Sequence, residues 1–95
     1  MLQFGILKNP SDVLKDIALK HKKLRKKVGF SQQEMAIRSG ISLGSLKRFE
    51  TSGQISFESL LKLAHILDRI EDFDGVFTVE DSIENIEKLF SDKTR

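Results

Sequence analysis

The chain lacks cysteine, has a single proline and contains no long apolar run. Without cysteine it can form neither a disulfide nor a thiolate metal site. No stretch approaches the roughly 20 apolar residues that a helix needs to cross a membrane. The apolar start at residues 1–7 is short and no basic residue precedes it, so it is a poor signal peptide. We therefore expect a soluble, cytoplasmic protein with no membrane segment.

Charges of both signs are present, but the two halves of the chain differ. Residues 1–50 hold 11 Lys or Arg and 4 Asp or Glu, whereas residues 51–95 hold 5 and 10. The corresponding balances are +7 and −5, which together give the net charge of +2. A chain polarised in this way can present a basic face to phosphate groups and an acidic face elsewhere. The alternative is that both halves are ordinary solvated surface.

Residues 32–51 have the spacing of two short helices that cross at a tight turn. Ala36 is small where the second helix must pass close to the first, and Gly40 can adopt the left-handed conformation that ends a helix. Ser31 and Ser42 are good N-cap residues directly before the two helices. The positions that face the core are apolar: Met35, Ile41, Leu46 and Phe49. This pattern is a helix-turn-helix, in which the second helix enters the major groove of DNA.

The stretch GFSQQEMAIRSGISLGSLKRFE (residues 29–50) resembles the lambda repressor and Cro-like family, also called the XRE family. The similarity runs from about residue 17 to residue 77. Ser39 departs from the family pattern, because this position is usually apolar, but a serine there can bond to the backbone of its own helix. The resemblance implies an all-α fold, a compact bundle of about five helices, and members that usually bind operators as dimers.

The predicted DNA-contacting residues lie on the second helix of the motif and at the start of the first. They are Gln32, Gln33, Ser42, Leu43, Gly44, Ser45, Lys47, Arg48 and Thr51. The resemblance implies base contacts at Ser42, Leu43, Gly44 and Arg48, and a glutamine that holds the DNA backbone at Gln32. Arg48 can make a bidentate contact with guanine and Leu43 can pack on a thymine methyl, whereas Lys47 suits a phosphate. The alternative is plain solvation of an exposed helix.

Charged residues of the first helix also bear on this motif. The resemblance implies an ion pair between Arg25 and Glu50, which would join the first helix to the end of the third and orient it without touching a base. A lysine cluster in the first helix is a second candidate for phosphate contact: Lys20, Lys22, Lys23, Lys26 and Lys27. These lysines circle the helix, so we expect only two or three of them to face DNA.

The remaining residues predict further helices around one small core. Asn9 and Pro10 begin a helix that runs to Val28, and Ser56 caps a fourth helix. A short fifth helix is expected at about residues 69–74. The expected inward positions of the first and fourth helices are Val13, Leu14, Ile17, Leu24, Val28, Phe57, Leu60, Leu61, Ala64 and Leu67.

The two ends of the chain form separate segments in this interpretation. Residues 1–8 are predicted to form a short extended segment, because apolar and other residues alternate from Leu2 to Ile6, and a second copy could pair with this strand. Residues 9–77 form the helix-turn-helix domain. Residues 78–95 form an acidic tail, in which apolar residues at helical spacing predict a sixth helix at about 79–91.

No set of catalytic or metal-binding residues stands out. His21 and His65 are far apart in the chain, and we interpret each as a core residue. The carboxylates after position 68 fit a solvated face better than a paired acid and base. A glycine-rich phosphate loop and a nucleophile beside a base are both missing. We therefore expect no enzyme activity, no metal and no cofactor.

Two functions fit these observations. The first is a sequence-specific repressor that binds double-stranded DNA as a homodimer on a palindromic operator and regulates its own promoter. The alternative is an antitoxin, because residues 48–56 and 73–77 are similar to small regulators associated with HipA-type kinases. In those systems the regulator binds its promoter and also holds the toxin, so the further partner would be a HipA-like kinase.

Overall fold

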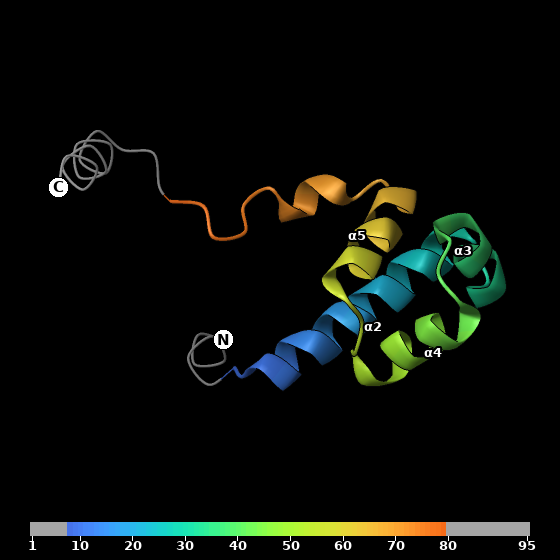
Figure 1. The fold of residues 1–95 in the computed structure, drawn as a ribbon, viewed down its shortest axis with the longest axis horizontal. Helices are drawn as coiled ribbons and strands as arrows, with labels where there is room; N and C mark the ends of the chain where they lie inside the picture. Colours follow the sequence, from blue (N-terminus) through green and yellow to red (C-terminus); the bar gives the residue numbers. More distant parts are fainter. Residues whose placement is uncertain (1–7, 80–95) are drawn as a thin grey trace, which may run out of the picture.

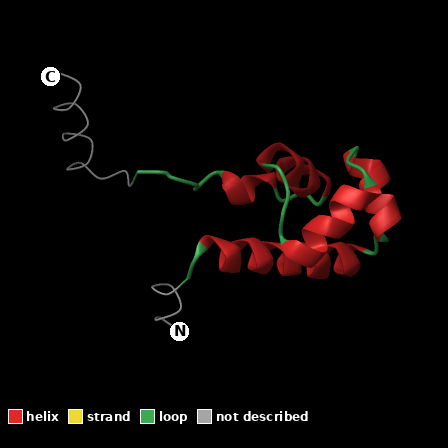
Figure 2. Cartoon of the chain, turned by 60° about the horizontal axis from the view of Figure 1, so that its bottom comes forward, coloured by secondary structure: helices red, strands yellow, loops and turns green. Residues whose placement is uncertain are grey.

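A computed structural model describes residues 8–79, which form four α-helices and one 3-10 helix (Figure 1). The elements are α2 (Pro10–Val28), α3 (Gln32–Ser39), α4 (Leu43–Ser52), α5 (Phe57–Ile66) and the 3-10 helix η1 (Ile70–Phe73). No strand occurs among residues 8–79 (Figure 2), so the predicted all-α class is confirmed for this part of the chain. The predicted N-terminal strand and nearly all of the predicted sixth helix lie outside the described residues.

Each α-helix begins at a side chain that accepts a hydrogen bond from a backbone amide three residues later. At α2 the Asp12 amide donates to Asn9 Oδ1 over 2.9 Å. Ser31, Ser42 and Ser56 accept in the same way at α3, α4 and α5, each over 3.0 Å. Such caps satisfy backbone donors that have no partner inside the helix, and each contributes on the order of 1 kcal/mol. The predicted starts of the four helices are therefore confirmed.

The core lies where α4 crosses α2, with α3 and α5 packed against it (Figure 1). Four side chains of three helices are at most 1 % exposed: Met35, Leu46, Phe49 and Leu63. Burial of each such side chain favours folding by roughly 1.5–3 kcal/mol. Three of these side chains, Met35, Leu46 and Phe49, belong to the helix-turn-helix motif and were expected to be buried. The inner face of the motif therefore forms the centre of the core.

The buried face of α2 differs from the predicted one. Val13, Leu14 and Val28 are exposed, whereas Ala18, His21 and Arg25 are buried. These three residues recur at intervals of three and four positions, so they share one side of the helix. The burial of His21 confirms its interpretation as a core residue. Apolar periodicity did not indicate the burial of Arg25, because its side chain is charged and is compatible with burial only through its hydrogen bonds to Glu50 of α4.

The inward face of α5 also needs correction. Leu63, which was not expected inside, is completely buried, whereas Phe57 is exposed and contacts the ring of Phe73 edge-on at 5.9 Å between ring centroids. His65 is exposed, so its assignment to the core was wrong.

The predicted fifth α-helix is the four-residue 3-10 helix η1. Asp68, which follows the C-cap Leu67 of α5, adopts a left-handed conformation with φ of 59° and redirects the chain. None of the helices among residues 8–79 is both long enough and apolar enough to cross a membrane.

Gly53 fixes the crossing of α4 and α2. It ends α4 with φ of 86°, a conformation that residues with a Cβ rarely adopt. A Cβ at this position would lie 2.7 Å from the carbonyl carbon of Leu14 in α2. Gly40 ends α3 with a similar φ of 79°, but among residues 8–79 nothing beyond its chain neighbours lies within 4 Å of its missing Cβ. Glycine is therefore required at position 53 both by the left-handed backbone conformation and by the close approach of α4 to α2. At position 40 only the backbone conformation requires it.

We expect Gly53→Ala to destabilise the fold more than Gly40→Ala. Both variants incur about 1–2 kcal/mol for the left-handed conformation. Gly53→Ala should cost a further 1–3 kcal/mol, roughly, because the new methyl group overlaps the backbone of α2. Urea denaturation of the two variants measures the difference. Equal losses would show that the end of α4 moves away from α2 at little cost.

Candidate nucleic-acid interface

The outer face of α4 is polar and basic, and the inner face is buried. Leu46 and Phe49 point into the core, whereas Gly44, Ser45, Lys47, Arg48 and Thr51 are exposed. Neither Lys47 nor Arg48 forms an ion pair with any residue among 8–79. Arg38 on α3 differs, because it pairs with Glu34 at 2.9 Å and stacks over the Phe30 ring at 4.6 Å. The charges of Lys47 and Arg48 are thus available to an external anion.

Leu43 is placed differently from the prediction. It is only partly exposed and packs against the core cluster. Helical side chains lean towards the N-terminus of their helix, and Leu43 is the first residue of α4, so this lean carries it back over the turn. The side chain therefore offers an edge to the outer surface and not its full length.

Two predicted hydroxyl contacts are already occupied within α4. Ser42 Oγ caps the helix and donates to Ser45 Oγ over 2.9 Å. Thr51 Oγ1 donates to the carbonyl oxygen of Lys47 over 2.8 Å. Both oxygens retain acceptor capacity, but their protons are engaged in these bonds. Ser39, the residue that departs from the family pattern, donates to the carbonyl oxygen of Ala36 over 3.3 Å, as expected of a serine bonded to its own helix.

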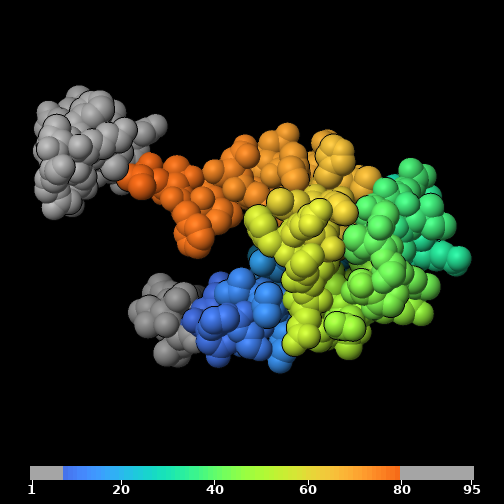
Figure 3. Space-filling view, viewed as in Figure 1, coloured from blue at the N-terminus to red at the C-terminus, as the bar shows by residue number. Residues whose placement is uncertain are grey.

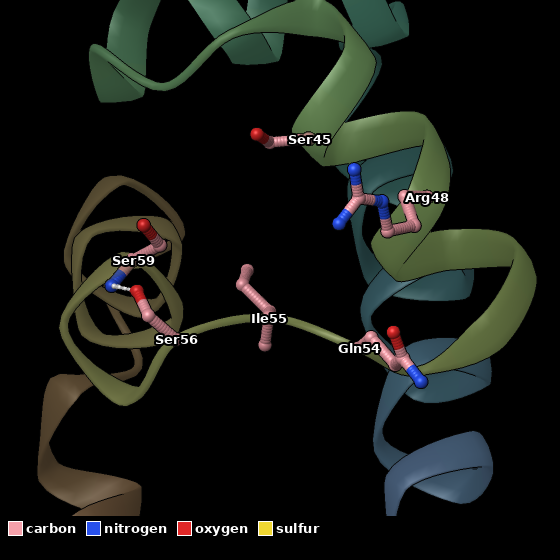
Figure 4. Close-up of a pocket in the computed structure, with 6 residues that line it drawn as sticks. All are labelled: Ser45, Arg48, Gln54, Ile55, Ser56 and Ser59. Carbon is pink, nitrogen blue, oxygen red and sulfur yellow. Dashed lines mark hydrogen bonds between the residues drawn. The ribbon is translucent and has the colours of Figure 1, made fainter.

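A polar pocket lies between α4 and the beginning of α5 (Figure 4). Its volume is about 260 Å³, and it is lined by Ser45, Arg48, Gln54, Ile55, Ser56 and Ser59. The Arg48 guanidinium group extends from α4 towards this space, opposite the serines of α5 (Figure 4). Gln54 and Ser59 were not predicted as site residues. The sequence feature that could have indicated them is the N-cap Ser56, because it shows that α5 begins only a few residues after Arg48.

The start of α3 presents backbone donors, and one of its glutamines is held inside. Gln32 Nε2 donates to Glu50 Oε1 over 3.0 Å, so this amide does not extend into solvent. Gln33 is exposed. The amides of Gln32 and Gln33 precede the first intrahelical bond of α3, and such amides favour an anion.

The carboxylate of Glu50 joins α2, α3 and α4. Arg25 donates to it twice, from Nε to Oε2 and from Nη2 to Oε1, each over 2.9 Å. Gln32 adds its bond to Oε1, and His21 Nδ1 lies 2.8 Å from Oε2. Arg25 Nη1 also donates to the Phe30 carbonyl oxygen over 2.8 Å, which ties the loop before α3 to α2. The Glu50 side chain is only 3 % exposed, so the pair implied by the resemblance belongs to a buried four-residue network.

Burial and hydrogen bonding shift two pKa values in this network. Burial alone raises the pKa of the Glu50 carboxyl, but hydrogen bonds from Arg25 and Gln32 outweigh it, and the net pKa lies below the usual value. Burial lowers the pKa of His21, and this effect exceeds the opposing attraction of Glu50. A neutral His21 that contacts a carboxylate through Nδ1 carries its proton there and donates it to Glu50. Its Nε2 has no hydrogen-bond partner among residues 8–79.

The lysines of α2 lie on different sides of the helix. Lys20 borders the side that faces α5 and pairs with Asp16 at 3.1 Å. Lys22 and Lys26, four residues apart, lie on the opposite flank of the Ala18–His21–Arg25 face. In residues 8–79 no group of three or more His, Asp or Glu side chains is arranged to hold a metal ion.

The His21 network predicts a loss of stability in mild acid. The unfolded histidine titrates near pH 6.5 and the folded one below it, so between these values the unfolded state binds more protons. The contribution of His21 to the free energy of unfolding should be fully present above pH 6.5 and should decrease as the pH falls towards the pKa of the folded state. Protonation of Glu50 should cause a further loss of stability below pH 4.5. His21→Gln should remove the first decline, and His65→Gln, at an exposed position, should keep it. Urea denaturation across this pH range gives the free energy of unfolding of each variant. If this free energy depended on pH in His21→Gln as it does in the unaltered protein, the decline would not be due to His21.

One known protein family matches the part of the chain that contains the candidate interface. The helix-turn-helix family model matches residues 22–72, more than half of the chain. The match begins within α2 and ends within η1, so it includes the whole motif and the Arg25–Glu50 pair. No curated protein and no solved structure gives a significant match. The chain belongs to the helix-turn-helix family of the lambda repressor and Cro-like type, a family of DNA-binding transcription regulators and not of enzymes.

Proposed function

We propose that the protein is a repressor that binds a palindromic operator as a homodimer, with α4 in the major groove, and controls its own promoter. The observation that carries this proposal is the outer face of α4, where Lys47 and Arg48 are exposed without an ion pair among the described residues. The helix beneath them is anchored through Glu50 to α2 and α3. A rigid helix with unpaired cations is suited to read base edges.

Arg48 is assigned to a base and Lys47 to a phosphate. The Arg48 fork can donate twice to guanine, whereas the Lys47 ammonium is a flexible point charge. Gly44 supports close approach of α4 to DNA, since no described residue beyond its own helix backbone and chain neighbours lies within 4 Å of its missing Cβ, so its packing within the protein does not require glycine. Leu43 contributes only its exposed edge. Because this readout set is small, DNA shape and half-site spacing should add to the specificity.

Two groups of donors on either side of α4 are assigned to the phosphate backbone. The first comprises the Gln32 and Gln33 amides at the start of α3, with the exposed Gln33 side chain beside them. The second is the pocket at the start of α5, where Gln54, Ser56 and Ser59 lie opposite Arg48. Phosphate contacts on both sides would set the register of α4 in the groove. Lys22 and Lys26 of α2 are the lysines best placed to add to this basic surface.

The homodimer follows from the small readout set, because one motif reaches only a few base pairs. Two copies would place their α4 helices about 34–36 Å apart, or a multiple of that distance, on two half-sites. We assign residues 9–77 to DNA binding and residues 1–8 to a strand that pairs with the second copy. Size-exclusion chromatography with light scattering tests the dimer, and a monomer at micromolar concentration would contradict it.

A second candidate function is an antitoxin that also holds a HipA-like kinase. It draws on the similarity of residues 48–56 and 73–77 to regulators of that kind, and on the exposed aromatic residues beside η1. Phe77 is 99 % exposed and Phe57 60 % exposed, and both belong to segments outside the helix-turn-helix. Co-purification of the protein with a kinase-like protein encoded in its own operon would support this function, and its isolation alone from that operon would oppose it.

Substitutions on α4 separate base reading from phosphate contact. Arg48→Ala should cost about 1–3 kcal/mol of binding and relax specificity at one base pair of each half-site. Lys47→Ala should weaken all sequences alike and lower the log–log salt slope by about 0.9 for each phosphate that the protein no longer neutralises.

Lys20→Ala serves as the matched control, because Lys20 is paired with Asp16 and borders the α5 side of α2. Binding should be measured by fluorescence anisotropy over a series of salt concentrations, on the operator and on variants of each base pair. If Arg48→Ala weakened every sequence equally, its assignment as the base reader would be wrong.

A further inference from the structure

A second hollow lies away from the DNA-binding motif, between α2, α5 and η1. Its volume is about 560 Å³, and none of its lining residues belongs to α3 or α4. Figure 3 shows it as an open notch between α2 (blue) and the residues that follow α5 (orange). Apolar side chains form most of the surface, among them Ile17, Leu24, Leu60, Leu63, Leu67 and Val76. We refer to this hollow as the α2–α5 groove.

The groove continues the hydrophobic core to the surface. Its floor contains Leu63 and Leu67, which are core residues, while Ile17, Leu24 and Leu60 are partly buried against them. On the outer wall Val76 remains 52 % exposed. A contiguous apolar surface of this kind usually marks a place where another segment binds.

The sequence after the groove supplies an occupant of matching chemistry. Val79, Ile83, Ile86 and Phe90 are separated by four, three and four residues, which is the spacing of one helical face. Glu80, Asp81, Glu84 and Glu87 fall between them. We propose that residues 79–91 dock as an amphipathic helix into the α2–α5 groove of their own chain, with the apolar residues inward and the carboxylates outward.

The connection favours the same chain over a second copy. Val76 lines the groove, and the described chain continues to Val79, three residues further on. A segment tethered so closely to its site has an effective concentration on the order of millimolar. A second copy would have to reach a similar protein concentration to compete. At lower protein concentrations the tethered segment should therefore occupy the groove in preference to a second copy.

The charges of the two surfaces are complementary. Of the Lys and Arg residues of α2, Lys20 lines the groove, whereas Arg25 is buried in the core. Arg69 stands at the opposite rim, where Asp72 pairs with it at 2.9 Å. Residues 79–91 carry four acidic residues and one lysine. Docking would place these carboxylates near Lys20 and Arg69, on a side that contains no residue of α3 or α4, which leaves the DNA-binding face free.

A spin label on the docking segment tests this proposal. The chain has no cysteine, so Asn85→Cys creates a single attachment point on the polar side of residues 79–91. In the isotope-labelled full-length chain, the spin label should strongly broaden amide signals of Ile17–Leu24 and of Val76. Signals of α3 should be less affected.

Two further arms decide the occupant. Ile83→Asp combined with Ile86→Asp should abolish the broadening, whereas Lys88→Gln combined with Ser91→Asp, which changes the net charge equally on the polar side, should leave it intact. In a mixture of spin-labelled unenriched protein with isotope-enriched protein without the label, no broadening is expected. Broadening in this mixture would assign the groove to a second copy and overturn the proposal. A lack of broadening in the singly labelled chain would show an open groove and would overturn it as well.

Discussion

The carboxylate of Glu50 is the contact on which the arrangement of the motif depends. A buried charge is strongly unfavourable unless other groups satisfy it. Here Arg25 from α2 meets both oxygens, Gln32 from α3 donates to one, and His21 contacts the other. Three helices must therefore be in place before this charge is satisfied. The gain in net stability over an apolar replacement can be small, but the contact favours this arrangement, because its hydrogen bonds join side chains of three helices.

This contact anchors α4 close to its C-terminal end, and Gly53 holds the end itself against α2. The outer face is left free for Lys47 and Arg48, whose side chains take no part in the network. Orientation and recognition are thus carried by opposite sides of one short helix. A helix fixed in this way loses little additional freedom on binding, which favours affinity. The α2–α5 groove belongs to a third surface, so a segment docked there need not interfere with DNA.

Local signals in the sequence were sufficient to place the four α-helices of residues 8–79. Asn9, Ser42 and Gly40 mark helix ends because caps and left-handed turns act over three or four residues, and the structure has helices with those ends. Contacts between residues far apart in the sequence were harder to predict. Gln32 was expected to face phosphate, yet it bonds to Glu50, which is 18 residues away in the chain. His21 was expected in the core and is buried, whereas apolar periodicity gave no indication that Arg25 is buried, since the partner that makes Arg25 compatible with burial lies on α4. The resemblance to a family identified the Arg25–Glu50 pair, whereas single-helix patterns could not.

Native-state hydrogen exchange of Glu50→Gln tests most directly whether this carboxylate fixes the recognition helix. The substitution keeps the shape of the side chain and removes its charge, and Glu34→Gln in the exposed pair with Arg38 is the matched control. If Glu50 anchors α4, the amides of Leu46–Ser52 should exchange at least roughly tenfold faster relative to those of α5, because hydrogen bonds to a charged group contribute about 1.5–3 kcal/mol. Glu34→Gln should leave this ratio unchanged. Equal acceleration of α4 and α5 in Glu50→Gln would contradict a specific anchor and would indicate only a general loss of stability.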